Sequence, residues 1–296
     1  MIRIITTEEE RASLCPARKF EQISGELGKE EVSLHVLKEE EIEDALKSFG
    51  KEDTILAETK NYRILTAVRE SGIRSTAENI QAVKFDEDKL LLKRVLAPRM
   101  VLTPRVVNLA TENMLHVSYF VKPLMLEDSI GIDEHSLCRN VEEAKRKVEA
   151  IRRDYGLPSI VEEYIDGEDV TCAVVKNNND SLFMMPVVIQ PNAASPYLSY
   201  DAKNGNRETY NPVNDLILRM RICQAAAETF DAIGAEHYAR IDMRVKDGYP
   251  YVLEVNLYPG LGNTGYMYQA LRLKGYGYRD FLKEILSTAT PQIPQR

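Results

Sequence analysis

The alternation of apolar and polar residues is sharpest over residues 239–257, where it predicts a β-hairpin. Alternate apolar residues of 241–245 share one face of the first arm, and those of 251–255 share the matching face of the second. Residues 246–250 read Lys-Asp-Gly-Tyr-Pro, a composition typical of a turn. We therefore expect two antiparallel strands with one apolar face turned to the core.

The register of this hairpin places two acidic side chains together. A pairing of Val245 with Tyr251 implies two further pairs, Asp242 opposite Glu254 and Arg240 opposite Asn256. Like charges directly across a ladder repel, so the acidic pair indicates a cation between the two carboxylates. Carboxylate and amide oxygens suit magnesium or manganese with bound phosphate better than zinc. The alternative is a solvated polar face with no ligand.

The remaining pattern divides the chain into three units of mixed α/β character. Residues 1–85 alternate apolar strands at 2–6, 32–37 and 54–59 with charged helices. Residues 86–166 begin with a basic helix, Asp86–Ala97, and continue through a buried strand, Tyr119–Pro123, and a long helix after Arg139. Residues 167–296 hold two apolar strands, a polar loop over 192–212, a long helix, the hairpin and two closing helices.

Composition narrows the classes of function. The chain has 296 residues, 44% hydrophobic and 28% charged, as in an ordinary globular protein. A net charge of −8 argues against nucleic acid or an anionic membrane as partner. We find no membrane-length apolar run and no signal peptide at the start. The four scattered cysteines allow two disulfides, but they are more simply reduced thiols of a cytoplasmic protein.

One familiar motif is rejected on its context. Residues 260–265, GLGNTG, fit the GxGxxG pattern and follow a strand. A dinucleotide fold needs a βαβ unit after that loop, with an acidic residue at the end of its second strand. The residues that follow read as helices, so we do not expect a dinucleotide site there.

Two lysines of the second unit are candidates for binding phosphate. Lys122 ends an apolar strand, and Lys89 lies in the basic helix. Solvated strand or helix ends would explain both, but a nucleotide phosphate chain needs fixed cations besides a metal. The loop after Lys122 offers the Ser129 hydroxyl and the backbone of Gly131. Residues 161–171, VEEYIDGEDVT, are either a surface turn or an edge that recognises a purine and its ribose.

These segments, in this order and spacing, resemble the ATP-grasp superfamily and its D-alanine–D-alanine ligase-like branch. The resemblance covers roughly residues 88–286 and rests on VKP with a downstream SIG, VEEYIDGEDVT, and ARIDMRV followed by YVLEVNLYPGL. It implies an N-terminal α/β layer and two domains that clasp ATP and Mg²⁺ (or Mn²⁺). A carboxylate would be phosphorylated to an acylphosphate, which an amine attacks to form an amide.

The resemblance also implies a role for each matching residue. At the nucleotide these are Lys89 and Lys122 on the phosphates, Glu162, Glu163, Tyr164 and Ile165 at the adenine, and Asp169 or its neighbour Glu168 at the ribose. The implied metal ligands are Asp242, Glu254 and Asn256, and the implied catalytic groups are Arg240, Lys203, Ser129 and the backbone near Gly260. Residues 199–210, which include Lys203, are the candidate lid over the acylphosphate.

Four departures from the family concern the substrates rather than ATP. In the family, a segment with glycines just after the first strand helps to hold the first amino acid substrate, and residues 6–20 lack such glycines. Asn204 stands where many members have a lid tyrosine, and Gly265 stands where they have a serine that binds the carboxylate of the second substrate. The loop before Ser129 is acidic, at Glu127 and Asp128. We therefore expect a ligase that joins amino-acid-like carboxylate and amine substrates other than two D-alanines. The alternatives are an authentic D-alanine–D-alanine ligase and a nucleotide-binding relative without catalysis. The family implies a homodimer.

Overall fold

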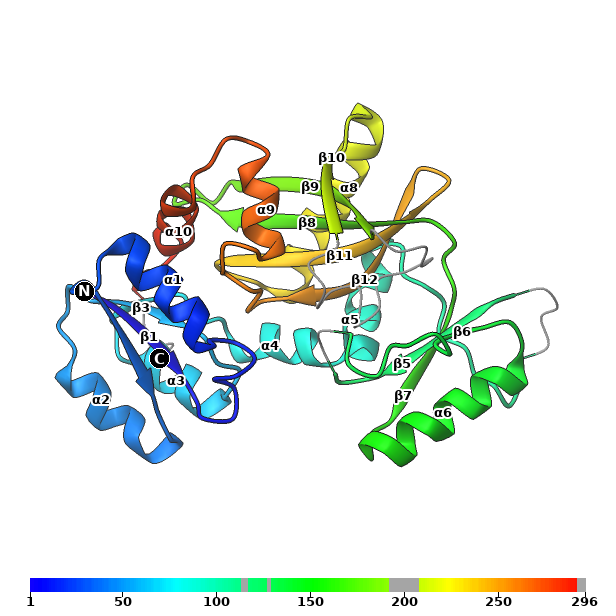
Figure 1. Ribbon diagram of the computed structural model, residues 1–296, viewed down its shortest axis with the longest axis horizontal. Helices are drawn as coiled ribbons and strands as arrows, with labels where there is room; N and C mark the ends of the chain where they lie inside the picture. The colour runs from blue at the N-terminus through cyan, green and yellow to red at the C-terminus, as the bar shows by residue number, and fades with distance from the viewer. Residues whose placement is uncertain (113–116, 127–128, 192–207, 292–296) are drawn as a thin grey trace.

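The computed structural model describes residues 1–112, 117–126, 129–191 and 208–291. These residues form three sheets (Figure 1): an N-terminal one at the left of the view, a small central one at the lower right and a larger C-terminal one between and above them. The α/β class expected from the hydrophobic pattern is confirmed. The division at residues 85 and 166 stays a prediction.

The N-terminal sheet has the strand order β13-β4-β3-β1-β2. Strands β1 (Ile2–Thr6), β2 (Val32–Val36) and β3 (Thr54–Ala57) lie where the apolar runs predict them, and they pair in parallel. The other two strands are β4 (Arg74–Ser75) and β13 (Thr290–Pro291), and the helices of this layer are α1 (Ala17–Leu27), α2 (Ile42–Ser48) and α3 (Tyr62–Glu70), with a 3₁₀ turn at Glu39–Glu41. Because β13 pairs with β4, the end of the described chain returns to its first layer.

The central sheet is β6-β5-β7, formed by β5 (Tyr119–Pro123), β6 (Leu137–Cys138) and β7 (Ser159–Glu163). Helix α6 (Val141–Tyr155) packs on it, with its start capped by the Asn140 side chain and its end closed by Gly156 in the left-handed conformation. Two helices lead into this unit, α4 (Ile80–Glu87) and α5 (Lys89–Leu96), followed by a 3₁₀ turn at Ala97–Arg99. The Asp88 side chain caps α5, so the helix predicted over Asp86–Ala97 begins at Lys89, and residues 86 and 87 belong to α4.

The C-terminal sheet is antiparallel and has the order β10-β9-β8-β11-β12. Its strands are β8 (Glu168–Lys176), β9 (Leu182–Pro191), β10 (Glu208–Pro212), β11 (Tyr238–Lys246) and β12 (Tyr249–Asn256), and its helices are α8 (Leu216–Ile233), α9 (Tyr266–Arg272) and α10 (Tyr278–Ser287). The expectation of one polar loop over 192–212 is wrong at its end, because residues 208–212 pair with β9.

The predicted hairpin is β11–β12, and its register is right at one end and wrong at the other. Asp242 lies opposite Glu254 and Arg240 opposite Asn256, as the alternation predicts. A register shift after Asp242 then pairs Val245 with Pro250 instead of Tyr251. Such a bulge adds one residue to one strand and reverses which side chains beyond it face the core. Val252 is consequently buried, whereas Leu253 is only half-buried.

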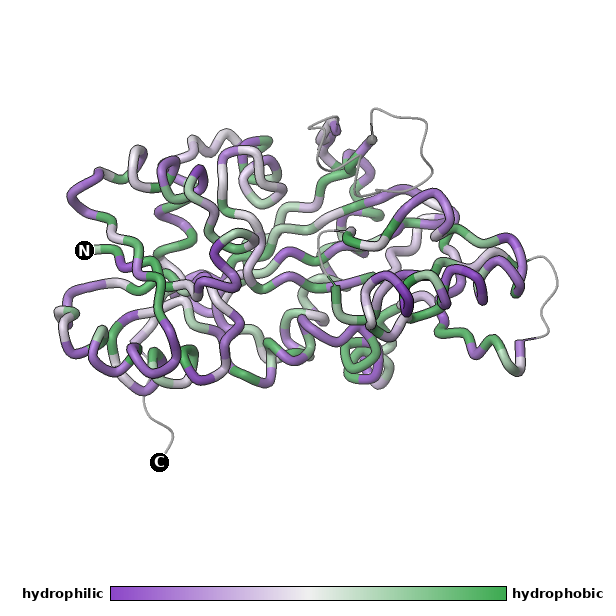
Figure 2. Tube along the Cα trace, turned by 60° about the horizontal axis from the view of Figure 1, so that its bottom comes forward, coloured by the Kyte–Doolittle hydropathy of each residue, from purple (hydrophilic) through white to green (hydrophobic). Residues whose placement is uncertain are grey.

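Two of the three apolar cores join the N-terminal and C-terminal layers. Ile5 and Ile55 pack in one cluster with Ile241 and Met243, and Ile4 and Leu56 pack in another with residues of β8 and β9. The central sheet and α6 have a separate core. Figure 2 shows the apolar residues gathered along the interior strands and the hydrophilic ones over the outer turns. The site described below therefore lies between two separately packed bodies.

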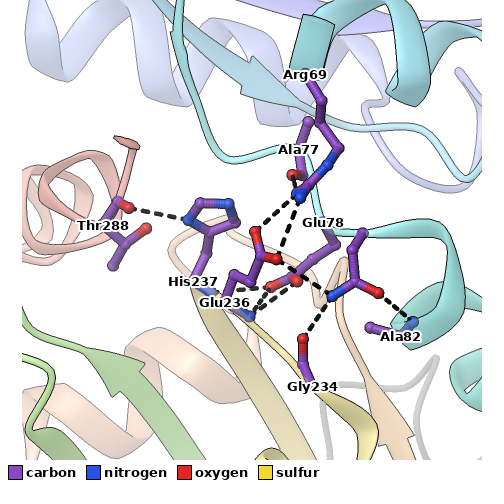
Figure 3. A network of polar contacts seen from close by, with 9 residues as sticks. Arg69, Ala77, Glu78, Ala82, Gly234, Glu236, His237 and Thr288 are labelled. Carbon is purple, nitrogen blue, oxygen red and sulfur yellow. Dashed lines mark hydrogen bonds and ion pairs between the residues drawn. The ribbon is translucent and has the colours of Figure 1, made fainter. Parts of the chain in front are cut away.

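Strand β11 is anchored at its start to the N-terminal layer (Figure 3). The buried carboxylate of Glu78 accepts hydrogen bonds from the backbone N–H groups of Glu236 and His237, at 2.9 Å each for the closest oxygen. Arg69 pairs with the Glu236 carboxylate at 2.7 Å. Burial raises the pKa of Glu78 to about 8, although the two backbone N–H groups act to lower it. An ion pair and hydrogen bonds to the buried Glu78 carboxyl group thus fix the strand that carries the predicted metal ligand Asp242.

Candidate active site

A pocket opens where the central sheet meets strands β8, β11 and β12. Most of the residues singled out in the sequence line it: Lys122, Ser129, Glu162, Glu163, Tyr164, Ile165, Asp169, Asp242 and Glu254. Further lining residues that the sequence did not single out include Phe120, Met243, Arg244, Leu253 and Tyr266. Segments that are far apart in the chain therefore converge on one concave site with both apolar and charged walls.

One end of the pocket holds the acidic pair of the hairpin. Asp242 accepts two hydrogen bonds from Arg240, Nε to Oδ1 at 3.0 Å and Nη2 to Oδ2 at 2.8 Å. The Thr171 hydroxyl, on the neighbouring strand β8, donates to the same carboxylate at 2.6 Å. These bonds fix the Asp242 carboxylate, whose neighbour across the ladder is Glu254. We call this group of residues the phosphate end of the pocket.

Arg240 is 8% exposed and stays charged in spite of its burial. Burial alone would lower its pKa, but the charge of Asp242 and the hydrogen bonds to it outweigh burial and raise that pKa. Its guanidinium also lies over the Tyr266 ring, 5.1 Å from the ring centre. Tyr266 in turn donates a hydrogen bond to Glu208 at 2.8 Å. A fixed cation of this kind suits a site where anionic oxygens meet.

The phosphate end has the chemistry of a magnesium site. Glu254 lies 3.7 Å from the ammonium of Lys89, which is 4% exposed and also donates to the carbonyl of Leu126 at 2.9 Å. The described residues contain no group of three or more His, Cys, Asp or Glu side chains placed to hold a metal. The predicted set has two carboxylates and the amide of Asn256, hard oxygen donors that leave positions for phosphate oxygens. These residues fit Mg²⁺ bound together with a nucleotide.

A buried triad of charges forms the wall beside this end. Glu162, 2% exposed, contacts Lys122 at 3.0 Å and Lys93 at 2.7 Å. Burial alone would raise the pKa of Glu162, but the charges of Lys122 and Lys93 outweigh it, and the pKa is lowered. One carboxylate between two lysines leaves a net positive charge in the wall. That charge suits the phosphate role predicted for Lys122.

Ser129 lies near Lys122 in a strained turn. It has a left-handed backbone (φ 60°), is 9% exposed and lines the pocket. Gly131, two residues on, needs to be glycine, because a Cβ there would lie 2.7 Å from the ring of Pro123. The loop after β5 is thus folded tightly back on that strand and carries the serine to the pocket. The acidic residues before it, 127 and 128, lie outside the described residues.

The other end of the pocket, which we call the nucleoside end, holds the residues predicted at the purine and ribose. Glu163, Tyr164 and Ile165 line it at the end of β7. Of the two acidic residues considered for the ribose, Asp169 lines the pocket and Glu168 is exposed outside it. The geometry therefore favours Asp169. Arg244, which the sequence did not single out, lies beside it at 3.2 Å.

Five predicted residues that the structure describes are not among those lining the pocket: Lys89, Glu168, Arg240, Asn256 and Gly260. Arg240 and Asn256 are buried behind it, next to Asp242 and Glu254 in the ladder, and Gly260 is exposed in the turn that follows β12. Lys203 and most of the predicted lid, residues 199–207, lie outside the described residues. Gly265 needs to be glycine, because a Cβ there would lie 2.1 Å from the carbonyl oxygen of Gly260. A serine side chain could not occupy this position in this backbone.

Four of the residues that sequence reasoning missed bear most on the chemistry of the site: Lys93, Arg244, Leu253 and Tyr266. The sequence spacing could have identified Lys93, since it lies four residues after Lys89 and so on the same face of helix α5. Strand alternation could have identified Arg244, because it follows Asp242 by two residues and shares its side of β11. Leu253 depends on the bulge and Tyr266 on the packing of α9, and no local pattern marks either.

Comparison with known proteins identifies the family. Residues 94–287, well over half of the chain, match the family described as D-ala D-ala ligase C-terminus. D-alanine–D-alanine ligase A of Bacillus cereus is 26% identical over 228 residues, which are 74% of this chain and 72% of the relative.

Solved structures share the fold over nearly the whole chain. D-alanine–D-alanine ligase of Bacillus anthracis in complex with ATP superposes with a TM-score of 0.73 at 19% identity, covering 97% of both chains. The VanG D-Ala:D-Ser ligase of Enterococcus faecalis has a TM-score of 0.70 at 15% identity and covers 97% of this chain and 98% of its own. The chain belongs to the D-alanine–D-alanine ligase family, ATP-grasp enzymes that form C–N bonds with ATP and Mg²⁺.

Proposed function

We propose that this enzyme joins a carboxylate and an amine, both amino-acid-like, into an amide through an acylphosphate, and that the pair is not two D-alanines. The single observation that carries the reaction type is the pairing of Asp242 with Glu254, next to the buried cation Arg240, at the mouth of a pocket lined by nucleotide-binding candidates. Metal ions and fixed cations at this place would offset the repulsion between a γ-phosphate and a substrate carboxylate.

Each phosphate-end residue has a task in this proposal. Asp242, Glu254 and Asn256 would hold Mg²⁺ against the phosphates, and Lys89 and Lys122 would balance their charge from the opposite wall. Arg240 would stabilise charge that develops during phosphoryl transfer and amine attack. Lys203, Ser129 and the backbone at Gly260 remain proposed contributors. Magnesium itself would supply Lewis-acid polarisation of the γ-phosphate.

The proposal of a different substrate pair rests on the wall beside Arg240. The residue that follows Gly265 is Tyr266, whose ring lies under Arg240 and whose hydroxyl is held by Glu208. This wall has no serine hydroxyl at 265 to receive an acceptor carboxylate, and it adds a bulky aromatic ring instead. The name of the Enterococcus relative shows that this fold also serves a ligase with a second substrate other than D-alanine.

An authentic D-alanine–D-alanine ligase is the second candidate, and the names of the matching curated relatives favour it. ADP release with MgATP separates the two when measured over D- and L-amino acids, ω-amino acids and small carboxylates, singly and in pairs. We expect the fastest release with a pair other than two D-alanines. Turnover with D-alanine alone would establish the second candidate. No stimulation by any pair, with ATP still bound, would contradict the ligase reaction itself.

No helix in the described part of the chain is long and apolar enough to cross a membrane. The cytoplasmic location expected from the cysteines and the homodimer implied by the family resemblance stay predictions. Sedimentation of the purified protein would test the dimer.

A further inference from the structure

Arg244 is a deeply buried charge at the nucleoside end of the pocket. It lies on β11, two residues beyond Asp242, and is 5% exposed while still lining the pocket. A buried arginine needs partners for its donors, because an unpaired buried charge is costly. Its contacts therefore indicate what the position is built to do.

The first contact is with the carboxylate proposed to meet the ribose. Arg244 and Asp169 are direct partners in the ladder between β11 and β8. Nη1 of Arg244 lies 3.2 Å from Oδ1 and 3.4 Å from Oδ2 of Asp169. A carboxylate accepts about four hydrogen bonds. The contact with Arg244 uses only part of that capacity.

Two further contacts fix the guanidinium itself. Nη2 donates to the carbonyl oxygen of Gly167, and it lies 3.4 Å from the hydroxyl of Tyr164. The guanidinium carbon also lies 5.1 Å from the centre of the Tyr164 ring. Residue 167 needs to be glycine, because a Cβ there would lie 2.0 Å from the carbonyl oxygen of Val245. The backbone that receives Arg244 is therefore tightly packed and leaves the side chain little freedom.

We propose that Arg244 is a positioning residue for ribose recognition, which holds the Asp169 carboxylate in place to accept hydrogen bonds from the hydroxyls of a ribonucleotide. It thereby makes the site select ribonucleotides over deoxyribonucleotides. This inference rests on the proposed function, since it assigns the nucleoside end of the same site. The guanidinium of Arg244 contacts Asp169, the carbonyl of Gly167 and the hydroxyl of Tyr164, so it orients Asp169 before the nucleotide binds.

Direct binding of nucleotides tests this role without any turnover. The probes are ADP, 2′-deoxyADP and 3′-deoxyADP with magnesium, titrated by calorimetry into the full-length protein. The variants are Arg244→Met, Arg244→Lys, Asp169→Asn and the double variant Arg244→Met/Asp169→Asn. Arg221→Met is the matched control, because Arg221 also lies over a tyrosine ring, 4.5 Å from the centre of Tyr249, but outside the residues that line the pocket.

For the wild type we expect about tenfold or greater preference for ADP over at least one deoxy analogue, since a hydrogen bond to a charged group contributes this much. Arg244→Met should reduce the preference to less than about threefold by weakening ADP, with little change for that analogue. Asp169→Asn should reduce the preference for ADP in the same way. The double variant should bind ADP no more weakly than Asp169→Asn alone. Arg244→Lys should be intermediate, and Arg221→Met should behave as the wild type.

Two results would overturn the role of Arg244. One is an equal loss for ADP and both analogues in Arg244→Met, which would indicate a purely structural residue. The other is a preference for ADP over the deoxy analogues in Arg244→Met that equals that of the wild type. If Arg244→Met does not fold, the same criteria apply to Arg244→Lys and Asp169→Asn. A protein that shows the expected preferences but no ligase turnover would refute the proposed reaction and leave this inference standing.

Discussion

The two ends of strand β11 differ in how they are built. At the phosphate end, Arg240 and Asp242 face Asn256 and Glu254 in the simple register that alternation predicts. At the nucleoside end, beyond the bulge, Arg244 faces Tyr251 on one side and Asp169 on the other. We propose that a metal and nucleotide phosphates complete the group of charges at the first end. At both ends an arginine already pairs with a carboxylate, but only the phosphate end places a second carboxylate, Glu254, across the ladder from that pair.

A single bulge divides the strand into two sites with different requirements. Like charges placed side by side at the phosphate end repel unless cations lie near them; Arg240 and Lys89 supply two, and we propose Mg²⁺ as a further one. The opposite charges at the nucleoside end stabilise each other directly. Variants at the phosphate end should therefore affect the chemical step, and those at the nucleoside end should affect nucleotide affinity.

The largest effect is expected at the acidic pair. Glu254→Gln should lower kcat by about a thousandfold or more, because it removes a charged metal ligand where phosphoryl transfer needs the cation. Steady-state ADP release measures it, with thermal unfolding as the check on the fold. Glu168→Gln, an exposed residue of β8 outside the pocket, is the control and should be unchanged. A kcat that Glu254→Gln leaves unchanged would contradict the assignment of Glu254 as a metal ligand.

The two lysines on Glu162 should separate into a binding residue and a structural one. Lys122 lines the pocket, whereas Lys93 contacts Glu162 and the carbonyl of Pro104 behind it. Lys122→Met should raise the KM for ATP about tenfold to a hundredfold, as expected on losing a charged hydrogen bond. Lys93→Met should mainly lower Tm, since it breaks a buried ion pair. Equal effects of both variants on KM would contradict this division.

The bulge predicts opposite outcomes for two adjacent apolar residues of β12. Leu253 lines the pocket, and Val252 is 1% exposed in the core. Leu253→Ala should weaken ADP binding about three- to tenfold, equivalent to the loss of an apolar contact of about 1 kcal/mol, with little change in Tm. Val252→Ala should lower Tm and leave ADP affinity nearly unchanged. The reverse pattern would show the unbroken register that the sequence suggested.

The smallest effect concerns the anchor of β11 and depends on pH. The folded-state pKa of Glu78 is about 8, above its ordinary value of 4.5, so the folded protein keeps a proton that the unfolded chain releases. Its contribution to stability is thus fully present below about pH 4.5 and is lost as pH rises through about 8. Relative to Glu78→Gln, the wild type should lose on the order of 5 °C in Tm between pH 5 and 9. A constant difference in Tm would contradict this.

The sequence predicts most of the fold because long apolar runs and alternation mark β1, β3, β5, β8 and the hairpin directly. It places Asp242 opposite Glu254 for the same reason, since period-two alternation fixes the register up to the first irregularity. The bulge adds a single residue and leaves no signal of its own, so Leu253 was placed on the wrong face. Strand β10 and the return of β13 to the first sheet depend on partners distant in the chain.

The transfer of oxygen from substrate to phosphate tests the central claim, amide formation through an acylphosphate, most directly. The carboxylate substrate that gives the fastest ADP release is labelled with ¹⁸O in its carboxyl group, and the inorganic phosphate is analysed by mass spectrometry after turnover. We predict one ¹⁸O atom in each phosphate released, because the bond broken by the amine leaves that oxygen on phosphorus. Phosphate without label, released together with amide product, would contradict the acylphosphate and with it the account of the phosphate end.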